Sequence, residues 1–202
     1  LTGDPFDIQL DFRIMPGYEE NFGWALVSIQ DITSRKKAED YLRYLGTHDA
    51  TTGLYNRAYF EETLVKFEKQ RRDPVSIIIF DLNYLKHAND THGHQAGDKL
   101  IRRAAEVIKA AISAEHVAAR IGGDEFAAIL ADTDEAIAAE YIKQVQVLIG
   151  LNNKYYREPE LSISVGAATS VPGISLEKII GKADDAMYAN KSEHHRRRKD
   201  DR

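Results

Sequence analysis

Apolar residues recur along this chain with two different periods, and the changes of period divide it into elements. Residues 6–16 and 21–33 alternate between apolar and polar positions, as β-strands do. Between residues 34 and 47 the apolar side chains instead fall on one stripe of a helix that ends near Gly46, with charged residues on its other side. Because two strands are too few to close a domain, the pattern predicts the C-terminal part of a domain, residues 1–33, and a connecting helix, residues 34–47.

Helical and strand patterns alternate over residues 48–193, which we expect to form one complete domain. The run VSIIIFDL (75–82) is typical of a buried central strand. Apolar runs at 116–121 and 125–130 predict two strands joined across Gly122 and Gly123, and a Gly-Gly pair favours a tight hairpin turn with positive φ. A last strand is expected at 161–169, and helical periodicity covers 57–72, 94–113, 134–151 and 175–192. This order predicts an α+β fold, with helices packed against an antiparallel or mixed sheet.

Composition narrows the class of protein. With 202 residues, of which 43% are hydrophobic and 29% charged, the chain is ordinary for a soluble globular protein. No apolar run approaches the ~18 residues of a membrane span, and the first residues lack a signal-peptide pattern. The absence of cysteine excludes disulfides, thiolate catalysis and Cys-type zinc sites, and it fits a reducing compartment. We therefore expect a cytoplasmic location, with any membrane anchor lying upstream in the full-length protein.

The net charge of −5 argues against a general nucleic-acid binder. Only HHRRRK (194–199) is strongly basic, and we interpret residues 194–202 as a solvated, frayed tail, with a phosphate contact or a partner surface as alternatives. Three histidines crowd the segment 86–98, but no clear fourth ligand completes a tetrahedral zinc site.

Acidic residues provide the candidate chemistry. Asp81 ends the predicted central strand, and Asp124 and Glu125 lie at the tip of the predicted hairpin. Such acids often only face solvent. If the hairpin pairs beside the central strand, however, Asp81 and Asp124 converge, and close carboxylates repel unless a hard cation lies between them. Oxygen ligands favour Mg²⁺ or Mn²⁺, which commonly bridge nucleotide phosphates, so the pattern indicates a nucleotide substrate. Lys86, in the polar loop expected at 86–98, is then either a surface lysine or a group that neutralises a transferring phosphoryl group.

Several motifs resemble the GGDEF domain of diguanylate cyclases, above all HDATTGLYNR (48–57), FDLNYLKHANDTHGHQAGD (80–98) and RIGGDEF (120–126). The resemblance runs from about Thr47 to Ser192. It implies a central, mostly antiparallel sheet flanked by helices, similar to the palm of nucleotidyl cyclases and polymerases. It also implies a homodimer of two GTP-loaded domains, in which each 3′-hydroxyl attacks the α-phosphate of the other nucleotide to give cyclic di-GMP and two pyrophosphates.

The same resemblance implies roles for individual residues. Asp81 and Asp124 would hold the Mg²⁺ or Mn²⁺ ion, together with the carbonyl of Leu82. Glu125 would be a second metal ligand or would take part in deprotonating the 3′-hydroxyl, and whether it or Asp124 is the base stays open. The other matched positions would contact the substrate: Lys86 in the transition state, the backbone of Tyr84 and Leu85 at the phosphates, Asn89 and Asp98 at the guanine edge, and His94, which would brace its loop and touch the nucleotide.

Physical chemistry supports three contacts with the nucleotide that the resemblance implies. An acid such as Asp98 accepts from the N1–H and the exocyclic amine of guanine, and adenine has no such donor pair, so GTP is expected to bind in preference to ATP. Gly122 and Gly123 would let the triphosphate lie against bare backbone. Lys191 continues the buried stripe of the last predicted helix and would meet a phosphate, although an interaction with the C-terminal dipole of that helix is the alternative.

The chain departs from the family pattern at several positions. Asn83 stands where a second aspartate is usual, which lowers the local negative charge and bears on metal affinity. Near the end, NKSEHHR has His194 and His195 where the family motif AKxxGRN has Gly and Arg, so one phosphate contact is in question. Ser113 and His116 occupy the ends of the family's R-x-x-D motif, so no inhibitory product site is expected.

Residues 23–49 resemble the last strands of a PAS sensor domain that run into a signalling helix. The resemblance implies an upstream sensor domain in the full-length protein, with the connector 34–47 setting the pairing of two cyclase domains. Two other functions fit the same residues. One is a regulatory module that binds GTP or a protein without catalysis, and the other is a generic phosphohydrolase with an acidic site.

Overall fold

The computed structural model describes residues 5–17, 20, 24–70, 73–156 and 158–200. The chain divides into two compact units, Leu1–Gly46 and Thr47–Arg202, and each is described by itself. Among the described residues, no helix is both long enough and apolar enough to cross a membrane.

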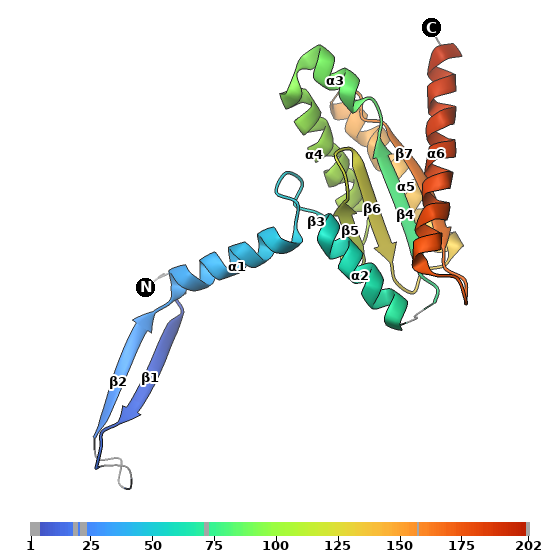
Figure 1. The fold of residues 1–202 in the computed structure, drawn as a ribbon. Coiled ribbons are helices and arrows are strands. Elements are labelled where there is room, and N and C mark those ends of the chain that lie inside the picture. The colour runs from blue at the N-terminus through green and yellow to red at the C-terminus, as the bar shows by residue number, and fades with distance from the viewer. Residues whose placement is uncertain (1–4, 18–19, 21–23, 71–72, 157, 201–202) are drawn as a thin grey trace. The chain divides into compact units, whose positions relative to one another are not determined.

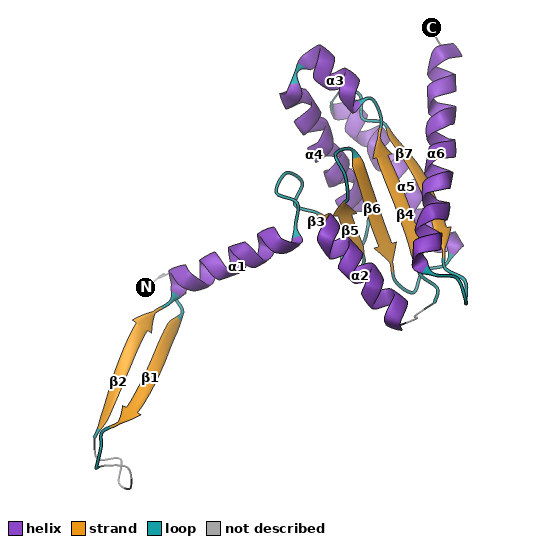
Figure 2. Cartoon of the chain, viewed as in Figure 1, coloured by secondary structure: helices purple, strands orange, loops and turns teal. Residues whose placement is uncertain are grey.

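The first unit contains an antiparallel hairpin of β1 (Ile8–Ile14) and β2 (Ala25–Asp31), followed by α1 (Thr33–Thr47) (Figures 1 and 2). The register pairs Leu10 with Ile29 and Phe12 with Val27, so apolar side chains share one face of the hairpin. That face is exposed, with 70% of Phe12 accessible to solvent. The predicted strands, and a helix at the position of the predicted connector, are thus confirmed.

The second unit is built on a five-stranded sheet in the order β3 (Tyr55–Asn56), β5 (Val117–Arg120), β6 (Glu125–Leu130), β4 (Ser76–Leu82), β7 (Ile163–Thr169). β3 and β5 run parallel, and all other neighbours are antiparallel. Helices α2 (Arg57–Gln70) and α6 (Leu176–Asp200) cover one face, while α4 (His94–Ala111) and α5 (Glu135–Tyr155) cover the other (Figure 1). The predicted α+β fold with a mostly antiparallel sheet is confirmed.

The central strand β4 is buried along its whole length because helices cover both faces of the sheet. Its alternate residues belong to two separate cores. Ile78 and Phe80 pack on the side of α4 and α5, whereas Ile77 and Ile79 pack on the side of α2 and α6. Since side chains alternate along a strand, Asp81 lies on the face covered by α2 and α6.

Two predictions about the extent of secondary structure are wrong. The expected loop at 86–98 is helical: α3 (Leu85–His92) and the start of α4 are separated only by Gly93, whose φ is 81°. Only Ala88 is buried in α3, so its sequence carries no apolar stripe that would predict a helix. The last helix was expected to end near Ser192, but α6 continues to Asp200, so the basic run 194–199 is helical rather than frayed.

Candidate active site

The central strand and the GGDEF hairpin bring acids together at one end of the sheet. β6 pairs antiparallel with β4, and the register places Glu125 directly opposite Asp81. Residues opposite each other on neighbouring strands share a face, with Cβ atoms about 4.5–5.5 Å apart. The amide of Leu82 donates to the carbonyl of Asp124 (2.8 Å), which fixes the hairpin tip against the end of β4. The predicted pairing of hairpin and central strand therefore exists, and the carboxylate that faces Asp81 is that of Glu125.

The Gly-Gly turn has a different conformation from the one expected. Positive φ occurs among the described glycines at residues 17, 53, 93 and 173, but not at Gly122 or Gly123. The loop is wider than a two-residue turn, because the amides of Ile121 and Gly122 both donate to the carbonyl of Glu125 (3.0 and 3.2 Å), so the positive φ required by two-residue hairpin turns does not apply here. A Cβ at Gly122 would lie 2.5 Å from Oε2 of Glu125. Gly122 therefore makes room for this carboxylate.

Arg120 holds the hairpin tip in place, a role that the sequence analysis missed. Its guanidinium donates to the carbonyls of Gly122 (3.1 Å) and Gly123 (2.8 Å) and forms an ion pair with Asp49 (3.2 Å). Burial alone raises the pKa of Asp49, but hydrogen bonds from Thr52 and the charge of Arg120 outweigh it, so this pKa lies below its ordinary value. The glycine turn is thus tied to the segment that directly follows α1 in the chain.

Lys191 reaches the acidic end of the sheet from α6. Its Nζ lies 2.8 Å from both carboxylate oxygens of Asp81, but only Oδ2 accepts a bond with hydrogen-bond geometry. The helix is held close to β7 because Gly166 leaves no space for a Cβ against the α6 backbone, and because Oδ1 of Asn190 accepts from the amide of Val165 (3.0 Å). Since α6 continues nine residues beyond Lys191, the alternative of a contact with the helix C-terminus is excluded.

These residues fit a divalent cation. Oδ1 of Asp81 is buried and has no hydrogen-bond donor among the described residues. Nowhere in the described ranges do three His, Asp or Glu side chains converge on one point, so the protein would supply no more than two carboxylates there. Mg²⁺ suits such a site, because it commonly takes one or two carboxylates together with phosphate oxygens and water.

The residues expected at the guanine edge lie on two neighbouring helices. Asn89, on α3, packs against Gly97 of α4, where an added Cβ would collide with the Asn89 amide. Oδ1 of Asn89 is buried and has no donor among the described residues. Asp98 follows Gly97 in the first turns of α4 and is exposed, as is His94, the first residue of that helix. The N-cap residue of α4 is Gly93, so this helix begins without a side-chain cap, and a role of His94 at the nucleotide stays a prediction.

The remaining predicted residues surround the end of β4. Lys86 is exposed on α3, and Tyr84 precedes that helix with a left-handed backbone (φ 62°), so the chain turns sharply between Asp81 and Lys86. The departure at Asn83 is accommodated by one serine of β7 and one just before it: the Asn83 amide donates to the hydroxyls of Ser162 (3.1 Å) and Ser164 (2.9 Å), and Ser164 donates back (3.0 Å). Of the two histidines near the end, His194 lines a cavity, and the side chain of His195 lies outside the described part.

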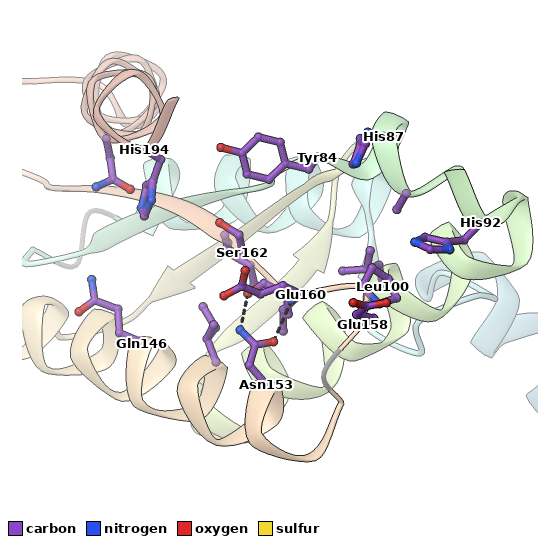
Figure 3. Close-up of a pocket in the computed structure, with 16 residues that line it drawn as sticks. Tyr84, His87, His92, Leu100, Gln146, Asn153, Glu158, Glu160, Ser162 and His194 are labelled. Carbon is purple, nitrogen blue, oxygen red and sulfur yellow. Dashed lines mark hydrogen bonds between the residues drawn. The ribbon is translucent and has the colours of Figure 1, made fainter. Parts of the chain in front are cut away.

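A cavity of about 700 Å³ lies beside this site, and the sequence analysis did not predict it. Figure 3 shows side chains from α3, α5, the segment 158–162 and α6 arranged around it. Of the predicted site residues only Tyr84 lines the cavity. Asp81, Asp124, Glu125 and Lys191 are not among its lining residues, so the cavity does not include the candidate metal ligands.

The positions that match the family's R-x-x-D motif carry a different arrangement. Ring atom Nε2 of His116 lies 3.1 Å from the hydroxyl of Tyr141, and burial lowers the pKa of the imidazole. Ser113 is exposed just after α4. These two side chains do not provide the charged pair of the family motif, and the absence of product inhibition stays a prediction.

Comparison with known proteins agrees with this geometry. The family model described as "Diguanylate cyclase, GGDEF domain" matches residues 46–197. The chain is 31% identical over 199 residues to "Cyclic di-GMP phosphodiesterase PdeB" of Shewanella oneidensis, covering 95% of this chain and 23% of that protein. It is 33% identical over 149 residues to "Probable diguanylate cyclase DgcT" of Escherichia coli K12, covering 71% of this chain and 33% of that protein.

Among solved structures, the coiled coil and GGDEF domain of DgcB from Caulobacter crescentus, in complex with c-di-GMP, superimposes with a TM-score of 0.70. The two chains are 28% identical, and the match covers 80% of this chain and 88% of that one. An α+β domain with acids at the end of its central strand pair thus has the fold of the nucleotidyl cyclases. The chain belongs to the GGDEF domain family of diguanylate cyclases, whose cyclases generally use divalent metals.

Proposed function

We propose that this chain is a diguanylate cyclase, the output domain of a bacterial signalling protein, which condenses two GTP into cyclic di-GMP and two pyrophosphates across a homodimer. The observation that carries the proposal is the pairing of Asp81 with Glu125, with Asp124 fixed to the same strand end and Lys191 beside it. Family membership supports the reaction class.

In this proposal the acids and lysines act on one phosphoryl transfer. Mg²⁺ or Mn²⁺, held by Asp81, Asp124 and the carbonyl of Leu82, would neutralise charge on the phosphate oxygens. Glu125 or Asp124 takes the proton of the 3′-hydroxyl. At the same time the hydroxyl oxygen forms a bond to the α-phosphorus of the nucleotide on the partner domain. The bond from that phosphorus to the bridging oxygen breaks, and pyrophosphate leaves. Lys86 and the backbone of the residues before it contact the phosphate oxygens as negative charge develops.

We further propose that Asn89 and Asp98 select guanine. The buried Oδ1 of Asn89 lacks a donor among the described residues, and a guanine N–H would supply one. Replacing Asp98 by Ser removes the acceptor for the N1–H and amine pair, so the preference for GTP over ATP should fall. An unchanged preference would remove Asp98 from this role.

Turnover of GTP tests the proposal directly. The purified chain is incubated with GTP and Mg²⁺, and cyclic di-GMP is measured by chromatography. Asp124→Asn should abolish the product with the circular dichroism spectrum unchanged, whereas Asp185→Asn, at an exposed position of α6, should retain it. Because each domain supplies only half of the reaction, specific activity should rise with protein concentration until all domains are paired.

Two other outcomes would favour the rival functions. Tight GTP binding without turnover would indicate a regulatory module. Asn83 and the histidines near the end favour it, as does a relative named for phosphodiesterase activity, of which this chain spans 23%. Release of free phosphate without a cyclic product would indicate a phosphohydrolase.

We also propose that residues 1–33 belong to a PAS-like sensor domain and that α1 transmits its state to the cyclase, with the reaction taking place in the cytoplasm, where GTP is available. The amphipathic hairpin supports the first part, because its exposed apolar face suits a strand pair covered by the rest of a domain. Fusing residues 1–46 to the remaining sensor sequence of the full-length gene product should reduce the exposure of Trp24, measured by its fluorescence maximum.

A further inference from the structure

The buried carboxylate of Asp81 needs a positive partner whether or not a metal is bound. Only 7% of its side chain is exposed, and it lies between two strands in a sheet covered on both faces. An ionised carboxylate removed from water is costly unless a positive charge or hydrogen-bond donors compensate it. Glu125, the residue opposite, has the same sign of charge and increases the need.

Lys191 provides this charge in the position that a cation would take. Its Nζ lies 2.8 Å from both oxygens of Asp81, so the ammonium group occupies the space in front of the carboxylate that a bound cation would need. A Mg²⁺ or Mn²⁺ ion held by either of these oxygens would lie close to the ammonium group and would be repelled by it. The two cations therefore compete for Asp81.

The lysine can leave without any rearrangement of the fold. Its side chain is 30% exposed, and a lysine stem is long and flexible. The backbone that carries it stays fixed, because Met187 is buried one turn earlier and Asn190 is bonded to β7. Only the side chain has to swing from the carboxylate into the solvent-facing mouth of the site.

We propose that Lys191 is the resident counter-ion of Asp81, which a divalent cation displaces, so that the lysine passes from the carboxylate to the nucleotide phosphates when the metal and nucleotide bind. The inference rests on the proposed metal site and adds an exchange step to it. Without nucleotide, Lys191 weakens metal binding because it competes for Asp81. With nucleotide bound, the ammonium group pairs with the phosphates and no longer competes. Metal and nucleotide then bind cooperatively, and each increases the affinity for the other by the same factor.

The test measures Mn²⁺ binding to the whole chain without nucleotide, from the electron paramagnetic resonance signal of free Mn²⁺. Lys191→Met and Lys191→Gln should bind Mn²⁺ about tenfold more tightly than the wild type, because the competing charge is gone. Lys191→Arg should keep the ion pair and the wild-type affinity. Lys182→Met, at an exposed position of the same helix, removes an equal charge and should change nothing.

The location of the bound ion is checked with Asp81→Asn, alone and combined with Lys191→Met. Both proteins should lose the Mn²⁺ site. Mn²⁺ binding by Lys191→Met and Lys191→Gln that is equal to or weaker than that of the wild type would overturn the proposal. So would tighter Mn²⁺ binding by Lys191→Met that persists when Asp81 is also replaced by Asn. A lysine that merely stabilises the fold predicts weaker binding on removal, which is the opposite result.

A second titration, with a non-hydrolysable GTP analogue, separates this inference from the proposed function. The analogue should tighten Mn²⁺ binding by the wild type more than by Lys191→Met. The analogue could leave the Mn²⁺ affinity of every protein unchanged, while Lys191→Met still binds Mn²⁺ more tightly than the wild type in the absence of nucleotide. In that case GTP binding is refuted and the competition at Asp81 stands.

Discussion

The close approach of α6 to β7 places Lys191, and replacing Gly166 by Ala should disturb it. An added Cβ at residue 166 would lie 2.7 Å from the carbonyl carbon of Ala186 and nearer still to two other backbone atoms of α6. Ordinary contact begins at 3.4 Å, so the helix must retreat by more than 0.7 Å (3.4 − 2.7). If α6 moves away from Asp81 as a body and the Lys191 side chain keeps its conformation, the Lys191–Asp81 separation grows from 2.8 Å to at least about 3.5 Å, beyond good hydrogen-bond distance.

The expected cost follows from overpacking. Backbone shifts of this kind typically cost about 1–3 kcal/mol. For a domain of about 150 residues each kcal/mol lowers Tm by about 2–4 °C, so Gly166→Ala should lower Tm by about 2–12 °C. Thermal unfolding measures this change, and Mn²⁺ titration should show tighter binding of the metal alone, since the ion pair with Lys191 is weakened.

The matched control is Gly181→Ala in α6, where no atom lies within 4 Å of the added Cβ. Alanine in a helix should stabilise that variant by about 0.5–1 kcal/mol. The reasoning is refuted if Gly166→Ala is as stable as the wild type and binds Mn²⁺ equally, because α6 would then not be held at backbone contact with β7.

Three further changes test other parts of the unit. Asn83→Asp should keep the fold, since both serine hydroxyls beside it can donate to a carboxylate, and should tighten Mn²⁺ binding; an unchanged affinity would show that residue 83 does not influence the metal. Arg120→Gln should cost about 1–3 kcal/mol in urea unfolding, because its ion pair is largely buried, whereas Arg57→Gln, in an exposed ion pair, should cost less than about 0.5 kcal/mol. Because the folded-state pKa of His116 is lowered, its contribution to stability is complete above the unfolded value of about 6.5 and declines as the pH falls below it. His116→Phe should therefore lose less unfolding free energy than the wild type between pH 7.5 and 5.5, and equal losses would contradict the buried neutral imidazole.

The strongest local patterns predicted their elements correctly, and the weak ones did not. β4 was predicted because a strand buried on both faces is apolar at nearly every position, and α6 because Ile179, Ala183 and Met187 recur with helical period. Helix α3 was missed because one buried residue in eight gives no period to detect. The φ values of the glycine turn were missed because the sequence does not reveal how many residues a hairpin loop contains.

The candidate site was predictable where the helix or strand that carries a residue also places it. It was unpredictable where a side chain binds a group that lies far away in the sequence. The approach of the acidic hairpin to Asp81 follows from strand ends and pairing, although the sequence analysis expected Asp124 to converge on Asp81 and the register places Glu125 opposite it. The guanidinium of Arg120, by contrast, binds two nearby carbonyls and also Asp49, which is 71 residues away in the chain. No periodic pattern in the sequence predicts such a long-range contact. The same limit applied to Asn83, where the missing negative charge was visible and the two serines that bind the amide were not.

Lys191 shows how length and direction of a helix decide between two interpretations of one residue. At the end of a helix a lysine is satisfied by the last carbonyls, and its charge is then unavailable to a site. Extending α6 by more than two turns removes those carbonyls from reach and leaves Asp81, 110 residues earlier in the chain, as the acceptor. The bare backbone of Gly166 and the bond from the amide of Val165 to Asn190 together hold α6 close to β7, so a glycine with no chemistry of its own helps to decide whether the lysine and a metal ion could compete for the same carboxylate.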